Sequence, residues 1–68
     1  MELRKNRTYK MKIRWLKGTR KLFVTDILFD NHPGVEAVVL GQFQDEQGGF
    51  TGIMKKDIHE AQLLEDPA

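Results

Sequence analysis

Apolar and basic side chains alternate in the run TYKMKIRWL, residues 8–16. Because successive side chains of a β-strand point to opposite faces of a sheet, this period of two predicts a strand with one buried and one solvated face. We therefore expect Tyr9 and Trp15 in the hydrophobic core. The apolar set comprises Tyr9, Met11, Ile13 and Trp15, and the basic set comprises Lys10, Lys12 and Arg14.

A second strand is predicted at residues 21–29 (KLFVTDILF), after a polar, glycine-containing turn at 17–20. Whether the hairpin loop has two residues or four, odd positions of the first strand pair with even positions of the second. Leu22 and Val24 then join the apolar face. Asp26 is expected on this same face, where its charge needs a hydrogen-bonding partner such as Tyr9 or a place at the end of a barrel.

Three further segments complete the predicted sheet. The turn formers at 30–34 (DNHPG) end the second strand, and the apolar run 35–43 predicts a central third strand in which Gly41 marks a bulge or a bend. A polar turn at 44–49 precedes a short fourth strand at 50–54.

The tail at residues 55–66 allows two interpretations, a helical face or a short turn followed by a last strand. We favour the turn. Asp57 is expected to cap a single 3₁₀ turn, and residues 62–64 are expected to close the sheet.

The predicted fold is therefore mostly β, a single five-stranded small barrel with a 3₁₀ turn or short helix near the C-terminus. Residues 1–7 are expected to form a basic flexible arm, and residues 8–66 the barrel domain. This order of parts resembles the SH3/Sm-like small barrels over residues 8–65, including the small Sm-like modulators of Rho-dependent termination and small archaeal chromatin proteins. A superfold of this kind implies no single role.

The end of the chain is similar to WYL-type ligand-sensing domains. It departs from their pattern at Gly52 and Ile53, where those domains carry an aromatic and an arginine. The resemblance implies at most a small-molecule ligand. It rests on Lys56, Asp57, Ile58, Ala61, Leu63 and Leu64.

A chain of 68 residues without cysteine has to be held together by packing. Oligomerisation or a partner could complete so small a core, and a homo-oligomer is one of the partners considered. With no cysteine and no apolar run long enough for a membrane span or a secretory signal, the chain is expected to be cytoplasmic, without a membrane partner.

Catalytic residues are not recognisable in the sequence. There is no serine, and His32 and His59 have no partner at metal-ligand spacing. We therefore expect neither an enzyme, nor a metal site, nor a cofactor.

Charge is distributed very unevenly along the chain. Residues 1–21 carry nine basic side chains and one acid, a net charge of +8, whereas residues 22–68 carry a net charge of −7. The first hairpin and the arm are therefore the candidate site for nucleic acid, either RNA or DNA, with phosphates bound by cations and a base stacked on the one aromatic. The candidate residues are Arg4, Lys5, Arg7, Lys10, Lys12, Arg14, Lys21 and Phe23.

Two other interpretations stay open. A lysine-rich outer strand also protects a sheet edge from aggregation. The two oppositely charged halves could instead serve a protein-interaction or inhibitor module. Such a module docks on an acidic protein surface, presents its acidic half to a basic partner as a mimic of nucleic acid, or binds a second copy head to tail.

Overall fold

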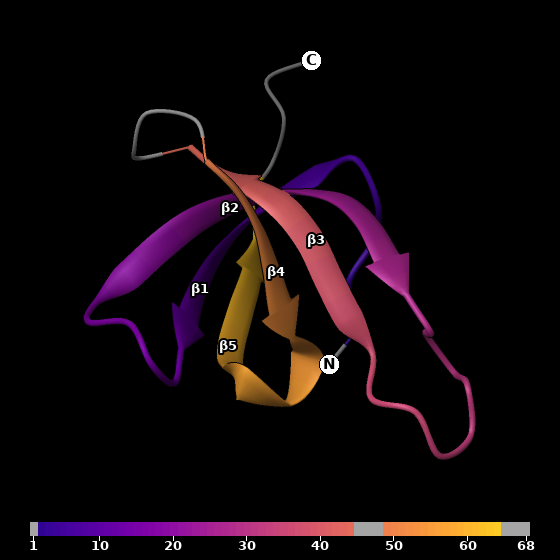
Figure 1. Cartoon of the computed structure of the whole chain (residues 1–68). Helices are drawn as coiled ribbons and strands as arrows, with labels where there is room; N and C mark the ends of the chain where they lie inside the picture. Colours follow the sequence, from indigo (N-terminus) through magenta and orange to yellow (C-terminus); the bar gives the residue numbers. More distant parts are fainter. Residues whose placement is uncertain (1, 45–48, 65–68) are drawn as a thin grey trace.

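The computed structural model describes residues 2–44 and 49–64, which form one strongly curled antiparallel sheet and a single 3₁₀ turn (Figure 1). The strands are adjacent in the order β4-β3-β2-β1-β5, so β4 and β5 are the two edges of an open sheet. This confirms the mostly β fold with a 3₁₀ turn near the C-terminus. The elements are β1 (Arg7–Ile13), β2 (Thr19–Leu28), β3 (Val38–Phe43), β4 (Phe50–Met54), η1 (Lys55–Asp57) and β5 (Ile58–Leu63).

The first hairpin pairs odd with even positions as predicted, with Tyr9 opposite Leu22. Its loop is longer than the two or four residues expected, because the last ladder pair is Lys12 with Thr19. The backbone N–H of Leu16 donates to the carbonyl of Ile13 at 3.0 Å, which turns the chain away from the sheet. The prediction that Trp15 belongs to the core is therefore wrong, since it lies in this loop and is 50% exposed.

The core lies on the inner side of the curled sheet. Apolar side chains from all five strands meet there, and Leu22, Val24 and Val39 are completely inaccessible to solvent. Leu3, from the segment expected to be an arm, is also buried in this cluster. The core residues are Leu3, Tyr9, Met11, Ile13, Leu22, Val24, Val39, Ile53 and Ile58.

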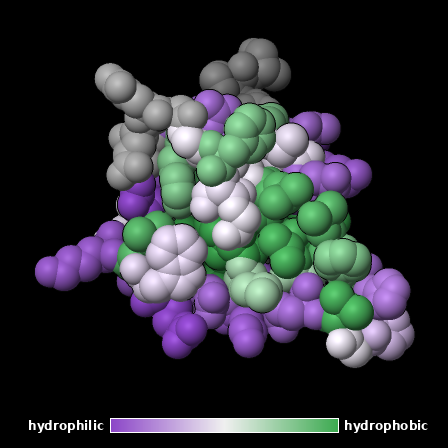
Figure 2. Space-filling model, in the orientation of Figure 1, coloured by the Kyte–Doolittle hydropathy of each residue, from purple (hydrophilic) through white to green (hydrophobic). Residues whose placement is uncertain are grey.

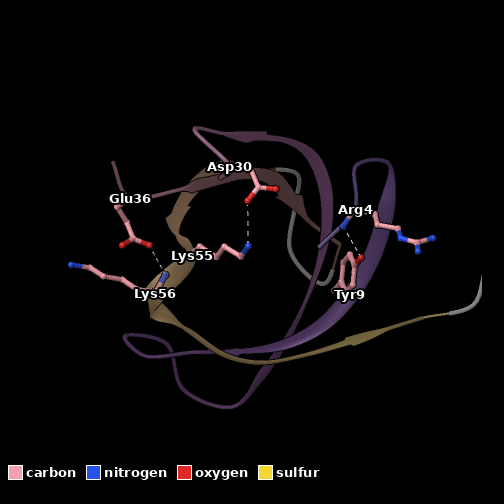
Figure 3. A network of polar contacts seen from close by, with 6 residues as sticks. All are labelled: Arg4, Tyr9, Asp30, Glu36, Lys55 and Lys56. Atoms are coloured by element: carbon pink, nitrogen blue, oxygen red, sulfur yellow. Dashed lines mark hydrogen bonds and ion pairs between the residues drawn. The ribbon is translucent and has the colours of Figure 1, made fainter. Parts of the chain in front are cut away.

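A bulge in β2 reverses the expected side for Asp26. The register between β2 and β3 shifts between Val24, opposite Gly41, and Asp26, opposite Leu40, and this leaves Thr25 without a partner on β3. The extra residue inverts the alternation, so Asp26 lies on the outer face. The expected core-facing position is therefore wrong. Asp26 is paired with Lys5, and the hydroxyl of Tyr9, one of the partners considered, accepts the backbone N–H of Arg4 at 2.8 Å (Figure 3).

The third strand starts at Val38, three residues later than predicted, because a long connection comes first. Two side chains from this connection bond to η1 (Figure 3). Lys55 Nζ lies 3.3 Å from the Asp30 carboxylate, and the backbone N–H of Lys56 donates to Glu36 at 3.2 Å. These bonds attach the β2–β3 connection to the turn between β4 and β5.

The fourth strand has the predicted bounds, and the closing strand is longer than predicted. Asp57 does not cap η1, since no side-chain hydrogen bond caps this turn. Its carboxylate instead accepts a hydrogen bond from Arg14 Nε at 2.9 Å, and its carbonyl accepts the Arg14 backbone N–H at 2.7 Å. Asp57 therefore joins the end of β1 to the start of β5.

Candidate functional site

Three lysines occupy the outer face of the first hairpin, and we call Lys10, Lys12 and Lys21 the lysine face. Lys10 and Lys21 are directly opposite in the ladder between β1 and β2. Residues paired in this way have Cβ atoms roughly 4.5–5.5 Å apart, so the two lysine side chains leave the sheet side by side. All three side chains are exposed.

The lysine face is only partly neutralised. Lys12 Nζ lies 3.7 Å from the Glu60 carboxylate, but both side chains are more than half exposed, so solvent and salt weaken this pair. Within residues 2–44 and 49–64, Lys10 and Lys21 have no ion-pair partner. The centre of this face therefore keeps its positive charge.

An outward-facing row of side chains crosses four strands next to the lysine face, and we call Thr8, Phe23, Gln42 and Phe50 the aromatic row. Each member is paired with the next across a ladder. Phe23 is partly buried, whereas Phe50 is 74% exposed. Sequence reasoning found Phe23 but missed Phe50, because only the ladder pairs bring position 50 into line with position 23.

The outer face also carries aliphatic side chains beyond the aromatic row. Figure 2 shows an apolar area on the side of the molecule where β3 and β4 lie in Figure 1. Leu28 and Met54, 36% and 43% exposed, are both paired with Val38 there. The outer surface of the sheet is therefore basic around Lys10, Lys12 and Lys21 and apolar around Val38, where Leu28 and Met54 meet.

The other four of the eight candidate residues are either ion-paired or outside the outward-facing series of the first hairpin. Arg14 is paired with Asp57, and Lys5 Nζ lies 3.2 Å from the Asp26 carboxylate. Arg7 is opposite Val24, on the core side of the sheet, although it is exposed at the strand end. Arg4 precedes β1 and is anchored through its backbone N–H. The structure therefore brings together Lys10, Lys12, Lys21 and Phe23.

Charge is less segregated in space than along the chain. Over residues 2–44 and 49–64, three cations of the basic segment 1–21 pair with acids of the acidic segment 22–68, and β5, which carries Glu60, lies directly beside β1. These pairs lessen the contrast between the two charged halves. They are Lys5 with Asp26, Lys12 with Glu60 and Arg14 with Asp57.

Among the residues that the structure describes, Asp26 is the ionisable group whose pKa is clearly shifted. The backbone N–H of Ile27 donates to its carboxylate at 2.8 Å, and Lys5 lies 3.2 Å from the same oxygen. The hydrogen bond first, and then the lysine, hold the pKa of Asp26 below its ordinary value. This carboxylate remains charged at neutral pH and stabilises the bulge beside it.

The histidines are separate from the lysine face. His32 is exposed in the β2–β3 connection, where its ring meets Phe29 edge to face at 6.2 Å, and His59 is exposed on β5. In the part of the chain that the structure describes, no three acidic or histidine side chains form a metal-binding group, and there is no pocket. None of its helices is long and apolar enough to cross a membrane.

Comparisons with known proteins give no relative for this chain: no family model, curated protein or solved structure matches it.

Proposed function

We propose that this protein is a non-catalytic binding module that contacts the phosphates of a nucleic acid through the lysine face. The carrying observation is that Lys10 lies directly opposite Lys21. Like charges in this position destabilise a sheet, and a bound anion would remove the repulsion. A phosphate between the two ammonium groups is the simplest such anion.

A nucleic acid explains more of the surface than a lone anion does. Cations supply most of the affinity for a phosphate backbone, and an aromatic side chain nearby can stack on a base. Phe23 lies next to Lys21 in the outward-facing series of β2. A regulatory role is part of the same proposal. So is a cytoplasmic location, because a protein that binds nucleic acid has to be in a compartment that contains it.

The finer fold assignment is part of the proposal. The strand order β4-β3-β2-β1-β5, the bulge in β2 and the 3₁₀ turn before the last strand support an SH3/Sm-like barrel. This superfold hosts many roles, so the function is argued from the lysine face alone.

A second candidate is docking onto an acidic protein surface. The lysine face adjoins Phe23, whose row continues to the exposed Phe50 on β4, and protein interfaces combine an apolar centre with a polar, charged rim. Poly-L-glutamate, which has the charge but no bases or phosphates, serves as the probe for this candidate.

The test is titration of single-stranded RNA and DNA oligonucleotides at several salt concentrations. Replacement of both Lys10 and Lys21 by Gln is expected to weaken binding and to reduce the slope of log K against log salt by about 0.7 for each lysine. The matched control replaces Lys17 and Lys56, which are exposed outside the lysine face, by Gln. It changes the net charge equally and is expected to change binding less.

Two outcomes would contradict the proposal. One is the absence of binding to either nucleic acid at low salt. The other is equal loss in both double variants, which would mean that net charge matters and the location of the lysines does not. Strong binding to poly-L-glutamate with none to oligonucleotides would favour the second candidate.

A further inference from the structure

The aromatic row places two aromatic side chains on one line across the sheet, the partly buried Phe23 and the exposed Phe50. Phe23 and Phe50 are both paired with Gln42, one from each side. With neighbouring strands about 4.8 Å apart, the two aromatic positions are separated by roughly 10 Å. An elongated ligand could contact both at once.

Phe50 contributes little to the fold. It is the first residue of the edge strand β4, it is 74% exposed, and it is absent from the core cluster. Exposing a phenylalanine to this extent forfeits most of the free energy that its burial would supply. Phe23, by contrast, is partly buried, so its ring is held in place by the sheet.

Gln42 lies between the two aromatic side chains and faces the same way. Its amide has both donor and acceptor groups. A side chain of this type can hydrogen-bond the edge of a base whose neighbours stack on the flanking rings.

The charges beside the row are complementary to phosphates. Lys10 and Lys21 form the adjacent outward-facing pair, two residues along their strands from Thr8 and Phe23. Two residues of β-strand span about 6.6 Å, a distance over which a nucleotide can reach from its phosphate to its base. A chain crossing the sheet would therefore have phosphates over the lysines and bases over the aromatic row.

We propose that the ligand is a single-stranded nucleic acid whose unpaired bases stack on Phe23 and Phe50, with Gln42 contacting a base between them. The inference rests on the proposed function, and it adds both the ligand class and the part of the site on β3 and β4. A duplex does not fit this arrangement, because pairing and stacking hide the base faces that the rings would contact.

The experiment measures binding of eight-nucleotide oligouridylate and oligothymidylate to the full chain and to Phe50→Ala and Phe50→Leu variants. Both are expected to weaken binding about 5- to 150-fold, the effect of losing one stacked base. Leucine restores apolar area without a ring, so its failure to rescue binding identifies stacking. The salt slope is expected to stay the same, because the phosphate contacts remain.

Met54→Ala is the matched control. Met54 is an exposed apolar residue on the same face of the same strand, and it lies outside the aromatic row. It is expected to bind within twofold of the unmodified chain. Thermal unfolding of each variant checks that the exposed substitutions leave the fold intact. A second readout is the Trp15→Phe, Phe50→Trp double variant, whose single indole is expected to be quenched by oligothymidylate.

The outcomes separate this inference from the proposed function. If Phe50→Ala binds like the unmodified chain while the Lys10, Lys21 double variant does not, the phosphate site stands and base stacking is overturned. If Met54→Ala loses as much as Phe50→Ala, or if a duplex of the same length binds as tightly as the single strand, stacking is overturned as well. Absence of any single-strand binding at low salt overturns both.

Discussion

The backbones of β2 and β3 approach so closely at Gly41 that a side chain would not fit. A Cβ atom there would lie 2.5 Å from the carbonyl oxygen of Phe23 and 2.9 Å from Leu22. Because one of these contacts is with backbone, a rotamer change cannot relieve it. Gly41→Ala is therefore expected to lower the free energy of unfolding by roughly 1–3 kcal/mol, measured by urea denaturation.

Gly52→Ala is the control for this prediction. A Cβ atom at Gly52 would meet only side-chain methyl groups, of Leu40 at 3.4 Å and of Val38 at 3.6 Å. We expect a change within about 0.5 kcal/mol, as for ordinary surface substitutions. Equal losses at both positions would mean that glycine flexibility, and not the close approach of the strands, sets the cost.

Asp26 links stability to pH. The Ile27 N–H and Lys5 hold its pKa in the folded state below the ordinary value, so folding favours the charged form. The stabilisation is complete above the unfolded-state pKa and is lost as the pH falls through the folded-state pKa. The difference in Tm between the unmodified chain and Asp26→Asn should therefore be constant near neutral pH and shrink below about pH 4. The measurement is thermal unfolding followed by circular dichroism.

Lys5→Gln refines this prediction. It removes the ion pair but leaves the Ile27 N–H bound to the carboxylate. Because this hydrogen bond is the larger cause of the lowered pKa, part of the acid sensitivity should remain. Complete loss of the pH dependence in Lys5→Gln would contradict the assignment.

At the scale of elements, the hairpin of β1 and β2 carries an unfavourable charge pair that a single substitution can reverse. Lys10→Glu puts opposite charges across the ladder from Lys21. It is expected to raise the free energy of unfolding by roughly 0.2–1 kcal/mol, and less in high salt. Chemical denaturation at two salt concentrations measures it.

Lys17→Glu makes the same charge change in the loop, where no ladder partner faces it. Equal stabilisation by both variants would show a general charge effect and would remove the argument for a specific repulsion. The expected combination, a more stable Lys10→Glu variant that binds nucleic acid less well, is the behaviour of a site where function opposes stability.

The ends of β1 and β5 depend on another pair, Arg14 and Asp57. Asp57 is 8% exposed, so loss of its partner leaves a carboxylate with little access to water. Arg14→Ala is expected to cost about 1–3 kcal/mol of folding stability. It should leave the salt slope of oligonucleotide binding unchanged, because the charge of Arg14 is already paired with Asp57. A reduced slope of log K against log salt would show instead that Arg14 contacts the phosphates.

Much of the sheet could be predicted from the sequence, because its signals are local. The alternation around Met11 fixes which residues of β1 face inward, and the glycines before Phe50 locate the start of β4. Trp15 and Asp26 were wrongly predicted for a different reason. Their positions depend on the length of a loop and on a bulge opposite Gly41, both of which are set by packing between strands.

The sequence predicted that Lys10, Lys12, Lys21 and Phe23 lie together, but it could not predict the parts of the candidate site that depend on contacts distant in sequence. The alternation along the chain assigns Arg14 to the same face as Lys12. In the fold, however, Arg14 is paired with Asp57, which lies 43 residues later in the sequence. Phe50 is separated from Phe23 along the chain and meets the same row only through two ladder pairs. Pairings over such distances leave no periodic signal in one sequence.

At the scale of the whole molecule, the order of strands predicts a gradient of protection from hydrogen exchange. β2 is central and contains Leu22 and Val24, which are fully buried, whereas β4 and β5 are sheet edges. Amide hydrogens of β2 should exchange slowest, and those of β4 that point away from β3 fastest. Exchange measured by NMR on dilute protein provides the test. Strong protection along the outer edge of β4 would instead indicate that a second copy covers it, as in a homo-oligomer.

Thr25 affects the bend of β2 but not the order in which its side chains face inward and outward. Val24 and Ile27 face inward and Asp26 faces outward, so removing Thr25 would restore an unbroken in-and-out order without moving any neighbour to the other side. What would be lost is the local bend. Thr25 thus leaves the residues of the inner and outer faces unchanged, and the bulge that it forms contributes to the curl of the sheet around its core.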